Sequence, residues 1–338
     1  MAKTVLVTGI SGFIAKHTAL EFLRAGYKVR GTVRSKAKGD RVIETLGRHA
    51  DASGVKIFEA ELSSDAGWEE AVTGCDCVAH VASPFPLAQP KDENELIKPA
   101  VEGTLRVLRA ARKAGVKRFV QTSSLVAVMY GHPHDKMVFN EDDWSVLNGA
   151  GMSPYNKSKT LAEKAARDFV AEEGGDMHFA TVNPGLVLGP ALDAEIGASL
   201  ELVQMFLAGK FPGAPRVVMP CVDVRDIAKM HLLATETGEP SGGRYLGCAA
   251  APWLIDISRA LKKGLGNKAR KTPKFELPDL VVKIVAIFDP VARLSVPELG
   301  LARSVDNSRT KKALGIEFIP VEKAAVASGE SLIEFGLA

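Results

Sequence analysis

The sequence has few cysteines and no arrangement of them that would form a disulfide scaffold. Its 338 residues contain four, Cys75, Cys77, Cys221 and Cys248, and none lies in a C-x-x-C pair. This number excludes the small disulfide-rich domains and fits a reducing compartment, where thiols serve as small apolar groups. We therefore expect a cytoplasmic protein with four structural cysteines.

The sequence also lacks an excess of charge and a long apolar run. The net charge is +3, too weak for a nucleic-acid-binding protein without a concentrated basic stripe. The longest late apolar run, 280–288, contains Lys283 and is too short to span a bilayer, so we expect a buried helix or a substrate lid there. With 46% hydrophobic and 25% charged residues, the composition is that of a globular protein with neither nucleic acid nor membrane as a partner.

The first half of the chain alternates strand-like runs with helical spacing. The runs lie at residues 4–8, 28–33, 55–60, 77–82, 118–123 and 178–183. Such alternation predicts an α/β fold, a Rossmann-type doubly wound parallel sheet with helices on both faces. The alternation of strand-like and helical segments ends after 183–190. We therefore expect a first domain over 1–185 and a smaller, mixed substrate-binding region over 186–338. Residues 221–248 read as a helix and a strand that return to the first domain.

A glycine turn between the first strand and the first helix indicates a dinucleotide site. In TGISGFIA, Gly9 and Gly12 permit a tight turn and let backbone N–H groups approach a pyrophosphate at the helix N-terminus. Ala15 takes the third glycine position, where helix and strand pack closely. The expected contacts come from Gly9, Ser11, Gly12, Phe13 and Ile14.

Basic residues follow the second strand, where an acid would bind the ribose of NADH. Arg34 stands at the strand end, and Lys36, Lys38 and Arg41 follow it. A 2'-phosphate would meet several cations here, so the pattern favours NADPH as cofactor, with Arg34 and Arg41 as its ligands. We therefore expect the first domain, 1–185, to bind NADP. The other reading is a solvated charged loop.

Three polar residues are candidates for the chemistry. Ser153 and Pro154 are typical of a helix start, which places Tyr155 and Lys159 one turn apart on one side. Alone, this spacing is as typical of a solvated helix face. Ser124 ends the fifth strand-like run, however, and ligands of open parallel sheets bind at the carboxyl ends of strands. We therefore expect these three side chains to converge.

The motifs TGISGFIA, HVASP, QTSS, YNKSK and NPGLVLGP together resemble the extended short-chain dehydrogenase/reductases over nearly the whole chain. The resemblance is greatest to the branch of dihydroflavonol reductases, cinnamoyl-CoA reductases and bacterial aldehyde/ketone reductases. It implies that Tyr155 is the general acid and that Lys159 binds the nicotinamide ribose and lowers the tyrosine pKa. It also implies that Ser124 binds the substrate oxygen, with Ser123 as the fallback. Further implied cofactor contacts are Glu61, where relatives carry Asp, and Leu62, Val81, Ala82, Ser83, Pro184, Val187 and Ser199.

Two departures from the family narrow the expected substrate. The chain has no N-W-Y-C-Y type signature at the tyrosine, which disfavours a CoA thioester. Met129 stands where dihydroflavonol reductases grip the flavonoid with Asn, which disfavours a flavonoid. The remaining expectation is an aldehyde or ketone reductase with a largely apolar pocket. The candidate pocket residues are Phe85, Met129, Tyr130 and Leu186. Each of them could equally be an ordinary residue of the hydrophobic core.

Two other functions fit the same fold. A nucleotide-sugar epimerase would recycle its cofactor, but Leu125 and Val126 stand where related dehydratases carry an acid/base pair. A regulator that only binds NADPH often lacks the tyrosine or the lysine, both present here. We expect no metal, because no acid or cysteine follows His132 and His134 at ligand spacing. A monomer and a homodimer are both compatible with the sequence.

Overall fold

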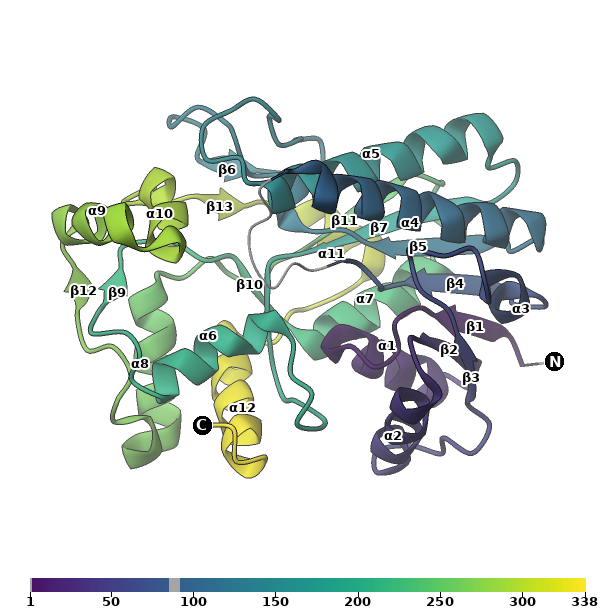
Figure 1. Ribbon diagram of the computed structural model, residues 1–338, viewed down its shortest axis with the longest axis horizontal. Helices are drawn as coiled ribbons and strands as arrows, with labels where there is room; N and C mark the ends of the chain where they lie inside the picture. Colours follow the sequence, from purple (N-terminus) through teal and green to yellow (C-terminus); the bar gives the residue numbers. More distant parts are fainter. Residues whose placement is uncertain (1, 85–91) are drawn as a thin grey trace.

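A seven-stranded parallel sheet forms the centre of the protein in the computed structural model, which describes residues 2–84 and 92–338 (Figure 1). Its order is β11-β7-β5-β4-β1-β2-β3, and every adjacent pair runs parallel. The strands are β1 (Thr4–Val7), β2 (Lys28–Val33), β3 (Lys56–Glu59), β4 (Cys77–His80), β5 (Arg118–Thr122), β7 (His178–Pro184) and β11 (Gly243–Gly247). The predicted fold class and all six predicted strands are confirmed.

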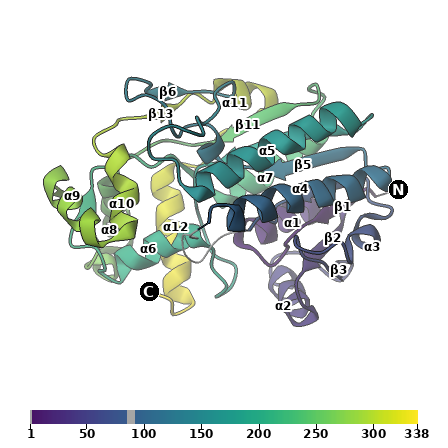
Figure 2. The same ribbon diagram turned by 45° about the horizontal axis from the view of Figure 1, so that its top comes forward.

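Helices cover both faces of the sheet (Figures 1 and 2). One layer holds α1 (Phe13–Arg24), α2 (Lys36–Gly47) and α7 (Val224–Glu236), and the other holds α3 (Trp68–Val72), α4 (Asn94–Lys113) and α5 (Pro154–Glu173). Alternation along β1 shows why: Val5 and Val7 pack with Phe22 of α1, whereas Leu6 packs with Leu108 of α4. Because both faces are apolar, the sheet is buried on both sides.

The chain beyond β7 builds a smaller helical region next to the carboxyl ends of the strands (Figure 1). Its helices are α6 (Ala198–Leu207), α8 (Leu254–Leu265) and α12 (Val321–Glu334), and α12 packs on both of the others. They share one apolar core with the sheet, in which Leu200, Leu261 and Leu332 join Val120 and Val182. The two-stranded pairs are β8 (Leu186–Leu188) with β10 (Cys221–Asp223), β9 (Ala214–Pro215) with β12 (Glu276–Leu277), and β6 (Val138–Phe139) with β13 (Ser304–Val305).

Within the segment 221–248, β11 pairs with β7 of the main sheet and α7 packs against α1, whereas β10 pairs with β8. The division of the chain at residue 185 stays a prediction. The other short elements are η1 (Leu125–Ala127), η2 (Gly266–Ala269), α10 (Pro290–Ser295), η3 (Val296–Glu298) and α11 (Ser308–Leu314). All four cysteines are buried.

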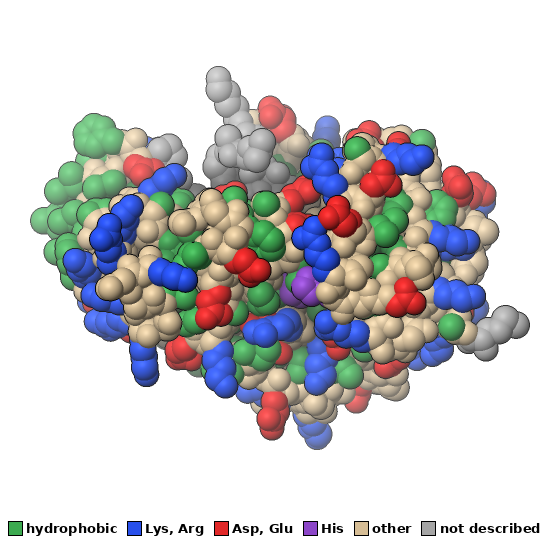
Figure 3. Space-filling view, turned by 90° about the horizontal axis from the view of Figure 1, so that it is seen from below, with side chains coloured by type: hydrophobic (Ala, Val, Ile, Leu, Met, Phe, Trp, Pro, Cys, Tyr) green, Lys and Arg blue, Asp and Glu red, His purple; other side chains and the backbone are tan. Residues whose placement is uncertain are grey.

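Helix α9 (Asp279–Phe288) differs from the sequence-based expectation of a buried helix. Leu280, Ile287 and Phe288 are 70%, 64% and 83% exposed, and only Val282 and Ala286 are buried. Apolar side chains accordingly gather at the end of the molecule where α9 lies (Figure 3). Of the two alternatives that the apolar run suggested, the buried helix is wrong, because α9 packs mainly on the small helix α10. The other alternative, a substrate lid, stays a prediction. Within residues 2–84 and 92–338, no helix combines the length and apolar content needed to cross a bilayer.

Candidate active site

The turn between β1 and α1 has the shape that a pyrophosphate requires. Gly9 has φ of +62°, and a Cβ on it would lie 3.0 Å from the Cβ of Ala82. Gly12 caps α1 and offers no side chain, so no side-chain acceptor occupies the first-turn N–H groups. Thr8 Oγ1 accepts a hydrogen bond from Ala82 N at 3.0 Å and ties the turn to the end of β4. The residues present therefore fit a dinucleotide.

The predicted cations lie at the end of β2. Arg34 follows the last residue of the strand and is exposed, as is Arg41 on α2. Lys38 pairs with Glu195 at 2.7 Å, which ties the start of α2 to the loop that precedes α6. Arg34 and Arg41 are thus available at the sheet edge next to the glycine turn, where the adenosine half of a dinucleotide lies in this fold.

The start of α5 follows its sequence signals. Ser153 Oγ accepts a hydrogen bond from Asn156 N at 3.2 Å, and Pro154 is the first helical residue. Tyr155 and Lys159 consequently lie one turn apart. At the end of β5, Ser124 caps η1, and its Oγ donates to Pro184 O at 3.3 Å. These bonds fix the backbone on which all three candidate residues stand.

One cavity of about 260 Å³ brings seven of the predicted site residues together, and Lys159 is not among the residues that line it. Ser124 and Tyr155 line it, and so do the predicted residues Met129, Tyr130, Pro184, Leu186 and Ser199. Ser123 lies behind the wall, because its Oγ donates to Glu163. Val187 is only 2% exposed and does not reach the cavity. Phe85 lies outside the described residues.

The remaining predicted cofactor residues lie along the strand ends. Val81, Ala82 and Ser83 follow β4 directly and are half-buried. Glu61 is exposed after β3, and its carbonyl accepts from the Trp68 indole at 3.1 Å. Leu62 packs beneath Gly103 of α4, where an added Cβ would come within 2.8 Å. Their contacts with a cofactor stay predictions.

Burial dominates the electrostatics of Tyr155 and Lys159. It raises the pKa of Tyr155 to about 12, with a further rise from Tyr130. It lowers the pKa of Lys159 to about 8, although Glu163 opposes the shift. The sequence-based expectation was a lowered tyrosine pKa. Burial moves this pKa in the opposite direction, because desolvation disfavours the phenolate.

Sequence reasoning missed part of the cavity wall. Residues 217–220 line it because β10 pairs with β8, and Leu186 N donates to Pro220 O at 2.7 Å. Glu298 and Arg303 line another side and form an ion pair at 2.9 Å. No local pattern marks these residues, since they come from loops far along the chain from the strands they approach.

A family model connects this geometry to known proteins. It is described as the NAD dependent epimerase/dehydratase family and matches residues 5–246, from β1 to β11. The chain belongs to this family. The matched stretch contains the glycine turn, Ser124 and the tyrosine–lysine pair, so the epimerase/dehydratase family model covers both halves of the proposed site.

Reductases are among the relatives within the epimerase/dehydratase family. The chain is 30% identical to ketoreductase azaE of Aspergillus niger, over 99% of this chain and 98% of the relative. It is 40% identical to dihydroflavonol 4-reductase of Arabidopsis thaliana, over 82% of this chain and 71% of the relative. The crystal structure of yeast methylglyoxal/isovaleraldehyde reductase Gre2 complexed with NADPH superposes with a TM-score of 0.82 at 27% identity, over 98% and 99% of the two chains.

These similarities confirm the predicted family, the extended short-chain dehydrogenase/reductases, and the predicted class of activity. The chain is an oxidoreductase of the epimerase/dehydratase family that uses a nicotinamide cofactor. The cytoplasmic location stays a prediction. Whether the protein is a monomer or a homodimer stays open.

Proposed function

We propose that this enzyme reduces an aldehyde or a ketone to an alcohol with NADPH. The observation that carries the proposal is that Ser124 and Tyr155 line one cavity, with Lys159 one helical turn from Tyr155. This cavity lies at the carboxyl ends of β5 and β7, where open parallel sheets bind their ligands. The names of the relatives, a ketoreductase and a dihydroflavonol reductase among them, support carbonyl reduction.

Each residue has a distinct role in the proposed reaction. The Ser124 hydroxyl and the Tyr155 phenol both bind the carbonyl oxygen, and the phenol gives it a proton as negative charge develops. NADPH, when bound, supplies the hydride that reaches the carbonyl carbon. The Lys159 ammonium binds the nicotinamide ribose and stabilises the phenolate that Tyr155 leaves behind. Because the pKa of Tyr155 is raised to about 12, the phenol holds its proton at neutral pH.

The preference for NADPH is assigned to Arg34 and Arg41. Both are exposed at the carboxyl end of β2 and the adjoining helix, and no acid stands at the position of Arg34. A guanidinium there can bind a 2'-phosphate by two parallel hydrogen bonds. The NADPH in the structure of the yeast relative agrees with this assignment.

The cavity favours a compact carbonyl compound with an apolar body. Its walls include Leu125, Met129, Leu186, Val217 and Met219. A volume of about 260 Å³ is below the range of about 300–1,000 Å³ for sites that hold drug-sized ligands. We therefore propose small aldehydes and ketones as substrates, and Met129 offers no amide to a flavonoid hydroxyl.

The test is the oxidation of NADPH in the presence of aliphatic and aromatic aldehydes, ketones and diketones. We expect stoichiometric loss of NADPH absorbance and formation of the alcohol for at least one class. Turnover of a nucleotide sugar with no net consumption of the cofactor would favour the epimerase reading. Binding of NADPH with no turnover of any substrate would favour the other alternative, a regulatory protein that only binds NADPH.

A further inference from the structure

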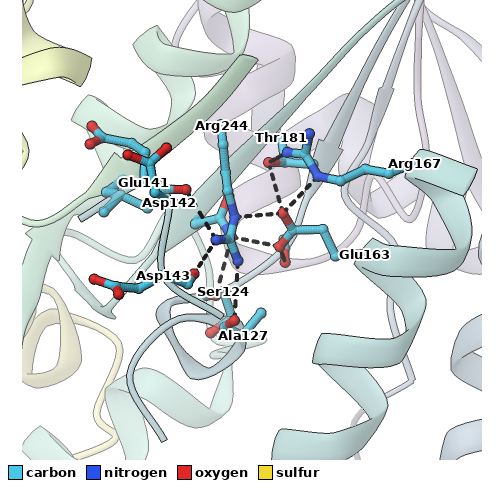
Figure 4. Close-up of polar contacts among 12 residues, drawn as sticks. Ser124, Ala127, Glu141, Asp142, Asp143, Glu163, Arg167, Thr181 and Arg244 are labelled. Carbon is cyan, nitrogen blue, oxygen red and sulfur yellow. Dashed lines mark hydrogen bonds and ion pairs between the residues drawn. The ribbon is translucent and has the colours of Figure 1, made fainter. Parts of the chain in front are cut away.

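A fully buried carboxylate lies one helical turn beyond Lys159 on α5 (Figure 4). The Glu163 side chain has no exposed surface. It accepts hydrogen bonds from Arg244 Nε at 2.7 Å and Arg167 Nε at 3.2 Å. Three more donors complete its shell, from the side chains of Ser123, Thr181 and Asn183. A carboxylate with this many hydrogen-bond donors is ionised. Burial disfavours its charge, but the two guanidinium groups favour it more strongly, so the pKa of Glu163 is lowered.

Arg244 connects this carboxylate to the loop that carries Ser124. Arg244 stands on β11 and is itself buried. Besides Glu163, its guanidinium donates to the carbonyl oxygens of Ala127 at 3.1 Å and Glu141 at 3.2 Å, and to that of Asp143 (Figure 4). Ala127 ends η1, the turn that Ser124 caps. One guanidinium thus holds η1 and the 141–143 loop against α5.

A second connection reaches Ser124 from β7. Asn183 Nδ2 donates to Glu163 Oε2 at 2.7 Å and to Ser124 O at 3.3 Å. Ser123, the residue before Ser124, donates its hydroxyl to Glu163 Oε2 as well. The backbone on both sides of the Ser124 side chain is therefore tied to Glu163, while the side chain faces the cavity. Glu163 therefore connects α5 and the end of β5, which carry the proposed reacting groups, with the end of β7.

Charge gives Glu163 a second effect, on Lys159. Burial disfavours the Lys159 ammonium, and Glu163 is the anion that opposes this. Among the described residues, His80 at the end of β4 also interacts with Lys159, and Tyr155 lies one turn from it on α5. Neither supplies a negative charge at neutral pH, because burial lowers the pKa of His80 to about 3 and raises that of Tyr155 to about 12.

We propose that Glu163, held by Arg244, is a positioning residue of this enzyme that fixes Ser124 relative to Tyr155 and keeps Lys159 protonated. The inference rests on the proposed function, because it assigns Ser124, Tyr155 and Lys159 their roles. It goes beyond that function by naming two residues outside the cavity on which the reaction depends.

The test compares Glu163→Gln with Glu172→Gln, the same substitution at an exposed position of the same helix. The amide of Glu163→Gln has no charge and brings a donor into a shell of donors. We expect kcat to fall by about ten-fold or more, as for other residues that orient reacting groups. We also expect the loss of activity at high pH to begin at least about one pH unit lower, because Lys159 loses its anion. Glu172→Gln should match the wild type.

Arg244→Lys separates positioning from charge. It keeps a cation beside Glu163 but cannot reach the three carbonyl groups at once. We expect kcat to fall with the basic limb of the pH profile unmoved. If Glu163→Gln does not fold, Arg244→Lys still tests whether the network positions Ser124.

A second readout does not need a substrate. The affinity for NADPH, followed by its fluorescence as the pH rises, should weaken at lower pH in Glu163→Gln than in the wild type. A Glu163→Gln variant with lowered thermal stability but unchanged pH profiles for kcat and for NADPH affinity would overturn the proposal and leave a structural ion pair. A wild type that binds NADPH with the expected pH dependence but reduces no carbonyl would instead overturn the proposed function.

Discussion

At the scale of single residues, the site depends on two groups whose pKa values burial moves in opposite directions. Tyr155 is shifted to about 12 and Lys159 to about 8. At neutral pH both therefore carry their protons, as a proton donor and a ribose-binding ammonium must. The sequence placed the pair correctly on one side of α5, because Ser153 and Pro154 are strong local signals. The direction of the tyrosine shift could not be read from the sequence, because it depends on packing around the ring.

The pH dependence of the reaction follows from these shifts. In the proposed mechanism Lys159 acts as a cation, and its charge is lost as the pH rises through its pKa. We expect kcat for carbonyl reduction to be constant near neutrality and to decline above about pH 8. Tyr155 stays protonated through this range, so the decline reports the lysine. A profile that stays flat to pH 10 would contradict this assignment.

The proposed role of Arg34 in the choice of cofactor can be tested by removing its side chain. Removing its side chain with Arg34→Ala deletes one charge-assisted contact, worth about 1.5–3 kcal/mol. We expect KM for NADPH to rise by roughly ten-fold or more, at 1.4 kcal/mol for each factor of ten, with KM for NADH unchanged. Initial rates with both cofactors check this. An equal change for both cofactors would move the role away from the 2'-phosphate.

At the scale of elements, the glycine turn between β1 and α1 shows which local features a sequence reveals. Gly9 and Gly12 predicted the turn, and at Gly9 the reason is conformational, because few other residues can take φ of +62° beside Ala82. The helix α9 shows the opposite case. Its run of apolar residues predicted either a buried helix or a substrate lid. Whether a helix is buried depends on what packs over it, and α9 packs mainly on α10.

The turn can be tested with a matched pair of glycine substitutions. Gly9→Ala forces a side chain into the left-handed region and places its Cβ 3.0 Å from Ala82, whereas Gly26→Ala forces the same strain with no atom within 4 Å. We expect each to lose about 1 kcal/mol or more of folding stability. Only Gly9→Ala should also weaken NADPH binding, as measured by fluorescence titration. Equal affinities for the two variants would argue against a pyrophosphate at this turn.

At the scale of the whole molecule, β–α alternation predicted the parallel sheet, and β11 was correctly expected to return to it. The cavity could not be assembled in the same way. Its walls combine the ends of β5 and β7 with residues 217–220 and with Glu298 and Arg303, which are far apart in the sequence. The carboxylate network is equally non-local, since Glu163 and Arg244 are 81 positions apart.

Because the cofactor would bridge the glycine turn and the cavity, its binding should stabilise the fold as a unit. A ligand present at 100 times its Kd adds about 2.7 kcal/mol to the free energy of unfolding. We expect NADPH to raise Tm by several degrees and equimolar NADH to raise it less, as followed by differential scanning calorimetry. An equal rise with both cofactors would speak against the basic residues after β2 as phosphate ligands.

The most direct measurement is the rate of NADPH-dependent carbonyl reduction by Tyr155→Phe, with the best substrate of the wild type. The substitution removes one hydroxyl and keeps the ring that lines the cavity. Loss of a positioned proton donor predicts a fall in kcat of about 10²- to 10⁴-fold, with the Kd for NADPH nearly unchanged. A Tyr155→Phe enzyme that reduces the carbonyl at the wild-type rate would show that another group supplies the proton.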